Sequence, residues 1–158
     1  MPKDGGIGAS SKRREDVRFL TGAGNYTDDI NIHGQAHVFF LRSDIAHGTI
    51  TKIDTSAAEA MPGVVKIFTG TDFEAVGGMP CGWQVTDRHG QPMQEPKHPV
   101  LAHGKVRHVG EPIVAVVADT AEQARDAAEA VSLEIDALPA VVDMKEAVGD
   151  SARKVHDD

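Results

Sequence analysis

The sequence of 158 residues contains a single cysteine, Cys81. One cysteine is too few for an intrachain disulfide, a cysteine-ligated iron–sulfur cluster or a four-cysteine zinc site. Low cysteine content is typical of proteins from a reducing compartment, so we expect a cytoplasmic protein. A chain of this length buries about two thirds of the surface that it exposes when unfolded, which is enough for a core without covalent cross-links.

Positive charge, aromatic rings and long hydrophobic runs are also scarce. Sixteen Lys and Arg stand against 24 Asp and Glu, and the only aromatic residues are five Phe, one Trp and one Tyr. The net charge of −8 repels nucleic-acid phosphates and few rings can stack on bases, so we expect no nucleic-acid binding. The longest apolar run, residues 113–118, is far shorter than the ~20 residues of a membrane span, and the N-terminus lacks the apolar stretch of a signal peptide.

Turn-forming residues divide the chain into three parts. Residues 1–35 contain six glycines and few apolar side chains, which predicts an extended N-terminal arm. Residues 36–150 are expected to form the folded domain, interrupted at 70–99 by a loop rich in Gly and Pro. Loops of that length are usually functional, covered by a partner, or disordered. Residues 151–158 are expected to begin a linker to a further domain.

Hydrophobic periodicity predicts an α+β (mixed α/β) fold, with one main helix packed on a mixed sheet. Strands are expected at residues 36–42, 49–54, 64–68, 105–109, 113–118 and 132–136, and a short helix at 56–61. The main helix is expected from Ala121 to about Ala130, because Thr120 and Gln123 form a capping-box pattern. Its buried stripe is expected to consist of Ala121, Ala124, Ala128 and Val131, and strand 132–136 alternates so that Leu133 and Ile135 face inward. If the two strands that flank this helix are parallel, they form a right-handed crossover.

The residues alone predict no catalytic set. The glycine groups at residues 5–8 and 22–24 follow no predicted strand, so we expect no phosphate site. Most of the eight histidines lie beside Gly or Pro in loops, and we assign no metal ligand. Cys81 has no activating cation beside it, and Ser43 has no nucleophile-elbow context.

Glu111 is the best single candidate for a buried acid. It stands between Gly110 and Pro112, at the start of the most apolar predicted strand. Burial in such a place raises the pKa of a carboxyl group. Arg107 is near enough in sequence to pair with it, which would make the role of Glu111 structural.

Several longer motifs are more specific than any of these residues. They are REDVRFLTGAGNYTDD at residues 14–29, LRS at 41–43 with Ala46-His47, VRHVGEPIVAVV at 106–117, AAEAV at 127–131 and LPAVV at 138–142. In this order, and over nearly the whole chain, they resemble the start of the large subunit of molybdenum hydroxylases. That family includes the aerobic carbon monoxide dehydrogenase large chain, xanthine dehydrogenase, and aldehyde oxidase or oxidoreductase. The carbon monoxide dehydrogenase type, with separate large, medium and small chains, is the most similar, because the REDVRF arm begins the chain.

The resemblance implies an α/β hammerhead domain and a set of cofactors that this chain does not bind itself. In the intact family the large subunit holds a molybdenum–molybdopterin cytosine dinucleotide. Electrons leave through [2Fe-2S] clusters and FAD, which the three-chain type carries on an iron–sulfur small subunit and a FAD-binding medium subunit. The molybdopterin pocket and the catalytic glutamate belong to later parts of a longer chain, so no catalytic, cofactor-binding or metal-ligating residue is assigned here.

Two classes of function remain open. The first is a structural or assembly domain of a molybdopterin-dependent hydroxylase, non-catalytic in isolation, whose partners are the remaining large-subunit domains and the medium and small subunits. Its predicted interface residues are Arg14, Asp16, Arg18 and Phe19. The second is a free-standing module that binds a small ligand or a protein through the 70–99 loop. Truncation of a longer large subunit is the simplest interpretation.

Overall fold

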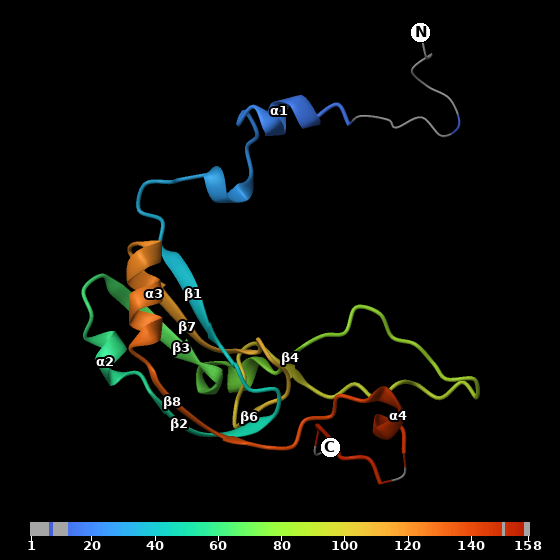
Figure 1. The fold of residues 1–158 in the computed structure, drawn as a ribbon. Coiled ribbons are helices and arrows are strands. Elements are labelled where there is room, and N and C mark those ends of the chain that lie inside the picture. Colours follow the sequence, from blue (N-terminus) through green and yellow to red (C-terminus); the bar gives the residue numbers. More distant parts are fainter. Residues whose placement is uncertain (1–6, 8–12, 150, 157–158) are drawn as a thin grey trace. The chain divides into compact units, whose positions relative to one another are not determined.

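The computed structural model describes residues 7, 13–149 and 151–156. The chain divides into two compact units, Met1–Gln35 and Ala36–Asp158 (Figure 1). Glycines 5, 6 and 8, and the last two residues of the predicted linker, lie outside the described residues. The assignment of 151–158 as a linker stays a prediction.

The N-terminal unit is not an extended arm throughout, which corrects the sequence-based prediction. It contains the helix α1 (Asp16–Leu20) and the 3-10 turn η1 (Thr27–Asp29), neither of which has a buried residue. The Phe19 N–H donates to the Glu15 carbonyl at 3.1 Å, which closes a helical turn. Residues 15–20 contain neither Gly nor Pro, so nothing in this segment opposes a helical turn, and Gly22, with φ of 73°, follows its end.

The second unit contains three sheets. Sheet A has the strand order β1 (His37–Arg42), β7 (Pro112–Ala118), β3 (Val64–Thr69). Sheet B has the order β6 (Lys105–Val106), β2 (Gly48–Asp54), β8 (Ser132–Ala137), and a third sheet joins β4 (Gly78–Met79) to β5 (His98–Pro99). The helices are α2 (Ser56–Glu59), α3 (Ala121–Glu129), α4 (Met144–Ala147) and the 3-10 helix η2 (Gly70–Val76). None of the helices in the described part of the chain is long and apolar enough to cross a bilayer.

The mixed α/β class with one main helix on a sheet is confirmed, but the strand directions differ from the expectation of a mixed sheet. Every pairing among the described strands is antiparallel. The conditional parallel crossover does not form, because β7 and β8 lie in different sheets. Both edges of β7 are already paired, with β1 and with β3, so the chain leaving α3 pairs with β2 in sheet B (Figure 1).

Helix α3 begins as its capping box predicts. The Thr120 hydroxyl accepts from the Gln123 N–H, and the Gln123 side-chain oxygen accepts from the Thr120 N–H, each at 3.2 Å. The buried stripe consists of Ala124, Ala127 and Ala128, whereas Ala121, which we expected in it, is exposed. These small side chains let the helix lie close against β1 and β7 (Figure 1).

One hydrophobic core lies between α3, sheet A and the apolar side of sheet B. Strand β7 supplies more of its buried residues than any other single element, with Ile113, Val114 and Val116 fully buried, as expected of a central strand. Leu133 and Ile135 of β8 face this core, which confirms the alternation predicted for that strand.

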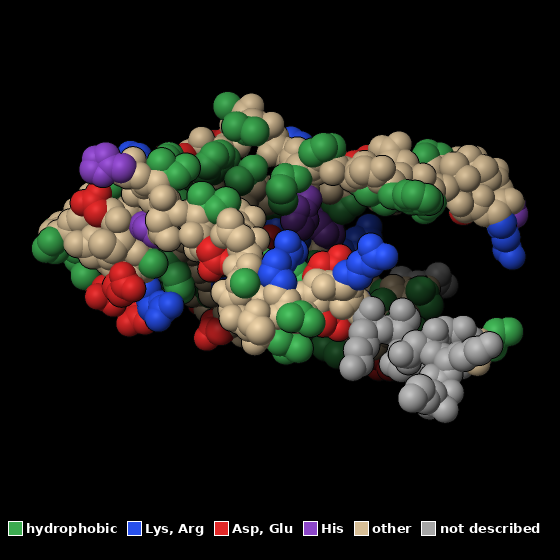
Figure 2. Space-filling view, turned by 90° about the horizontal axis from the view of Figure 1, so that it is seen from above, with side chains coloured by type: hydrophobic (Ala, Val, Ile, Leu, Met, Phe, Trp, Pro, Cys, Tyr) green, Lys and Arg blue, Asp and Glu red, His purple; other side chains and the backbone are tan. Residues whose placement is uncertain are grey.

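Two segments depart from the predicted elements. The expected strand at residues 105–109 ends at Val106, because the chain turns back there toward β7. The 70–99 loop starts with η2, whose first turn is held by the Asp72 carboxylate accepting from the Thr69 N–H at 2.7 Å. Glycines 77 and 78 follow, and beyond them the segment is mostly irregular and exposes hydrophobic side chains along its length (Figure 2).

Candidate functional site

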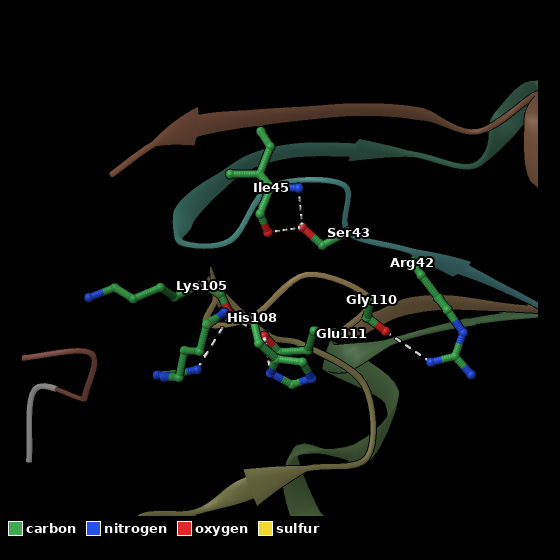
Figure 3. Close-up of polar contacts among 8 residues, drawn as sticks. Arg42, Ser43, Ile45, Lys105, His108, Gly110 and Glu111 are labelled. Carbon is green, nitrogen blue, oxygen red and sulfur yellow. Dashed lines mark hydrogen bonds and ion pairs between the residues drawn. The ribbon is translucent and has the colours of Figure 1, made fainter. Parts of the chain in front are cut away.

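Two segments that are distant in sequence meet at one end of sheet A and form a cluster of polar contacts (Figure 3). The Ser43 N–H donates to the Glu111 carbonyl at 2.9 Å, and the Gly110 N–H donates to the Ser43 carbonyl at 2.7 Å. The Arg42 guanidinium donates to the Gly110 carbonyl at 2.9 Å. These bonds fasten the turn at residues 107–111, here called the polar turn, to the end of β1.

Glu111 closes the polar turn from inside. Its side chain is 6% exposed, and its Oε2 accepts from the Arg107 backbone N–H at 2.5 Å. His108 Nδ1 lies 3.7 Å from the same oxygen (Figure 3). Gly110 has a φ of 84°, a conformation that residues with a Cβ rarely adopt. The prediction that Glu111 is buried is confirmed, and its geometry is that of a structural carboxylate bonded to a backbone N–H.

Ser43 and His47 are the other buried polar side chains of this region. The Ser43 hydroxyl donates to the Ile45 carbonyl at 2.7 Å and accepts from the Ile45 N–H at 3.1 Å, so it is used within its own turn. His47 Nδ1 lies 3.1 Å from the Pro139 carbonyl, which accepts only, so this nitrogen carries the hydrogen. Its Nε2 is buried without a hydrogen-bond partner among the described residues. Sequence reasoning missed the burial of His47, since its partner is 92 residues away.

The described residues offer no metal centre. No group of three or more His, Cys, Asp or Glu among them lies close enough to hold a metal ion. Two smaller contacts involve histidines: the rings of His98 and His108 stack with centroids 6.4 Å apart, and His103 Nε2 lies 2.9 Å from Glu74 Oε1. Two donors do not make a zinc or molybdenum site, so no chemical step through a metal is derived for this chain.

The predicted interface residues lie together in the N-terminal unit. Asp16 accepts from Arg13 Nε at 3.0 Å, and the Arg18 guanidinium lies 4.9 Å from the centre of the Phe19 ring. That ring stacks on Tyr26 with centroids 5.4 Å apart. Arg14 is exposed and Phe19 is 36% exposed, so both side chains have surface that a partner could contact. Their role at an interface stays a prediction.

The 70–99 loop is tied together by its own carboxylates. Glu95 accepts from the Cys81 N–H at 2.9 Å and from Gln84 Nε2 at 2.6 Å. The Cys81 thiol is exposed and donates to the Trp83 carbonyl at 3.2 Å. A cavity of about 810 Å³ lies between residues 94–96 of this loop and the segment that follows α4. The 70–99 loop therefore borders a concave surface, which the alternative function of a ligand-binding loop requires.

Three comparisons identify relatives of the chain. The family described as "Aldehyde oxidase and xanthine dehydrogenase, a/b hammerhead domain" matches residues 21–139. The nicotine 6-hydroxylase large subunit of Paenarthrobacter nicotinovorans is 42% identical over 142 residues, which are 90% of this chain and 17% of that protein. The carbon monoxide dehydrogenase large chain of Hydrogenophaga pseudoflava is 38% identical over 92% of this chain and 17% of its own length. Identity thus does not single out the carbon monoxide dehydrogenase type.

Solved structures agree with the sequence matches. Quinoline 2-oxidoreductase from Pseudomonas putida 86 superposes with a TM-score of 0.77 and 38% identity, over 92% of this chain and 18% of that one. The chain thus spans less than a fifth of the length of these relatives. The resemblance to molybdenum hydroxylase large subunits, and the hammerhead fold that it implies, are confirmed: the chain belongs to the aldehyde oxidase and xanthine dehydrogenase a/b hammerhead domain family.

Proposed function

We propose that this chain is the structural hammerhead domain of a molybdenum-dependent hydroxylase large subunit and is non-catalytic on its own. The observation that carries the proposal is the family match over residues 21–139. The segments of the nicotine 6-hydroxylase and carbon monoxide dehydrogenase large subunits that align with this chain are less than a fifth of those proteins. The rest of such a large subunit would hold the molybdenum–molybdopterin cytosine dinucleotide. Medium and small partner subunits would carry FAD and the [2Fe-2S] clusters.

The chemistry of the polar turn supports a structural role. Ser43 and Glu111, two of the three buried polar side chains of this region, are bonded to backbone atoms of nearby residues, and the third, His47, lies against the Pro139 carbonyl. A group engaged in this way fixes the conformation of a turn, and it must break a buried hydrogen bond before it can act on a substrate. The domain therefore offers a rigid body on which other domains can assemble.

Co-purification from the source organism tests this proposal. A tagged form of the chain should carry with it a flavin-containing and an iron–sulfur-containing polypeptide in stoichiometric amounts, identified by mass spectrometry. The 158-residue chain purified alone should contain no molybdenum by elemental analysis. Isolation of the chain without such partners, or a stoichiometric amount of molybdenum in the isolated chain, would overturn the proposal.

The N-terminal residues allow a sharper test of assembly. We propose that Arg14, Asp16, Arg18 and Phe19 contact the remaining large-subunit domains. Arg18→Glu reverses the charge that lies over the Phe19 ring, so it should weaken capture of those domains in a pull-down. Lys145→Glu, an exposed reversal in α4, is the matched control and should leave capture unchanged. Equal capture by the two variants would discard this interface.

A second candidate function is a free-standing binding module. The cavity beside residues 94–96 and the exposed Trp83 favour it. The reading frame of the source genome discriminates between the two: an in-phase continuation after Asp158 supports the hydroxylase domain. A native stop codon there, with no hydroxylase genes nearby, supports the module.

A further inference from the structure

The side of sheet A that faces away from α3 is only partly covered by the elements of its own unit. Ala115 of β7 is buried on that side and Phe68 of β3 lies against Phe73 of η2, but the side chains that β1 presents there are left exposed. Phe39 and Leu41 of β1 pack into the core under α3, and the Arg125 guanidinium of that helix lies 5.8 Å from the centre of the Phe39 ring. Because side chains alternate along a strand, Val38 and Phe40 point to the opposite side. Val38 is 52% exposed and Phe40 is 42% exposed, although both stand in a regular, paired strand.

The register of the sheet extends this apolar surface across all three strands. Val38 pairs with Val117, which pairs with Lys66, and Phe40 pairs with Ala115, which pairs with Phe68. Residues paired directly across neighbouring strands present their side chains on the same face. The outer face of sheet A is therefore defined by two rows, Val38–Val117–Lys66 and Phe40–Ala115–Phe68.

The charged side chains that β1 and β3 place beside this face, Arg42 and Lys66, are positive, and the acidic group known to interact with one of them is Asp72 of η2, near Lys66. The Arg42 guanidinium lies 5.5 Å from the centre of the Phe40 ring and is fixed by its bond to the Gly110 carbonyl. The Lys66 ammonium lies 6.0 Å from the centre of the Phe68 ring. The whole sequence has 24 Asp and Glu, yet β1, β3 and β7 contain none of them. An apolar centre flanked by cations matches a partner surface of apolar side chains flanked by carboxylates.

We infer that the outer face of sheet A docks against another part of a large-subunit chain, a segment whose apolar side chains cover Val38 and Phe40 and whose carboxylates meet Arg42 and Lys66. This inference rests on the proposed function. More than four fifths of the length of relatives such as nicotine 6-hydroxylase lies outside the matched segment and is available to supply that cover. Exposed apolar surface rimmed by charge is typical of an interaction site.

A second copy of this chain fits the face less well. A two-fold dimer through the outer face would bring the same surface of both copies together. Arg42 and Lys66 of one copy would then lie near those of the other, with no carboxylate in the three strands to compensate them. The charge pattern thus selects an acidic partner over self-association.

A chimera tests the inference in a complete large subunit. The 142-residue segment of the Paenarthrobacter nicotinovorans nicotine 6-hydroxylase large subunit that matches this chain is replaced by this chain, and the protein is expressed in that organism. Hydroxyl-radical footprinting then compares the oxidation of Phe40 in the chimera with its oxidation in the isolated 158-residue chain. We expect Phe40 to be oxidised several-fold more slowly in the chimera.

A pair of variants separates docking from folding. Val38→Asp in the chimera should lower the yield of assembled enzyme at least about tenfold, since it buries an unpaired carboxylate in the interface. Val142→Asp, at an exposed position outside the sheet, should not change the yield. The same Val38→Asp change in the isolated chain should leave its thermal unfolding temperature within a few degrees, because Val38 is already exposed there.

The outcomes distinguish the two proposals. If the unmodified chimera does not assemble with molybdenum bound, the proposed function itself is contradicted. If it assembles while Phe40 stays as reactive as in the isolated chain, or if Val38→Asp assembles normally, only the docking inference is overturned. Sedimentation of the isolated chain as a dimer that Val38→Asp dissociates would assign the face to a second copy and would also overturn it.

Discussion

The polar turn and the 70–99 loop are both glycine-containing connections in the second unit, but they differ in how far their own domain buries them. In the polar turn, Glu111 is buried and its carboxylate accepts from a backbone N–H of the same turn. In the loop, Glu95 also ties backbone and side chains together, but it is exposed, and Trp83 beside it is 80% exposed. The first connection is specified by the domain itself, whereas the second presents surface that its own domain does not cover.

The largest expected loss of stability comes from shortening a buried apolar side chain next to the polar turn. Ile113 is fully buried in β7, so Ile113→Ala should lower the free energy of unfolding by about 2–5 kcal/mol. Val85 in the loop is 51% exposed, and Val85→Ala should change the free energy of unfolding by no more than about 0.5 kcal/mol. Urea unfolding of both variants measures the contrast. Similar losses at the two sites would mean that the loop is as well packed as the core.

Removing the carboxylate of Glu111, and separately that of Glu95, should change the free energy of unfolding by intermediate amounts. Glu111→Ala leaves the Arg107 N–H without its acceptor and should cost about 1–3 kcal/mol. Glu111→Gln keeps an oxygen that can accept and should cost less. Glu95→Ala, the matched change in the exposed loop, should cost about 0.5 kcal/mol or less. If Glu95→Ala proved the more damaging change, the assignment of the polar turn as the rigid connection would be wrong.

The smallest expected effect is on the pH dependence of the unfolding temperature, through Asp72 at the start of the loop. The hydrogen bond from the Thr69 N–H is the main reason that the pKa of the Asp72 carboxyl lies below its usual value of 3.8; desolvation opposes it, and the weaker bond from the Thr69 hydroxyl adds to it. A carboxyl with a lowered folded-state pKa stabilises the fold above its unfolded pKa, and this contribution is lost as the pH falls through the folded-state pKa. Asp72→Asn should therefore flatten the fall of the unfolding temperature below about pH 4. If the unfolding temperatures of the unchanged chain and of Asp72→Asn fall equally as the pH is lowered, Asp72 makes no such contribution.

Local signals predicted the scaffold well. The capping box of Thr120 and Gln123 fixed the start of α3, because both partners lie within one turn. The alanine stripe was predicted less accurately: Ala127 is buried in place of Ala121, since the position of sheet A decides which side of the helix is covered. Strand β6 ends early because Glu111 draws residues 107–111 into a turn, and hydrophobic periodicity carries no information on that bond.

The candidate sites were harder to predict because they depend on distant pairings. His47 is buried by a contact to Pro139, which no local pattern indicates. The outer face of sheet A requires the register of three strands that are separated along the chain by loops and helices. Helix α1 in the predicted N-terminal arm was missed for the opposite reason: the glycines of that segment were given more weight than residues 15–20, a short stretch that contains no helix breaker.

The central claim is that this chain is scaffold and that the reactive centre is built from other polypeptide. Its most direct test is an assay of the purified 158-residue chain for turnover of aldehydes, purines and carbon monoxide, with an artificial electron acceptor and with molybdenum supplied during expression. We expect no turnover above that of a blank preparation. Turnover that follows the purified chain, with molybdenum bound to it, would mean that the chain carries a reactive centre of its own.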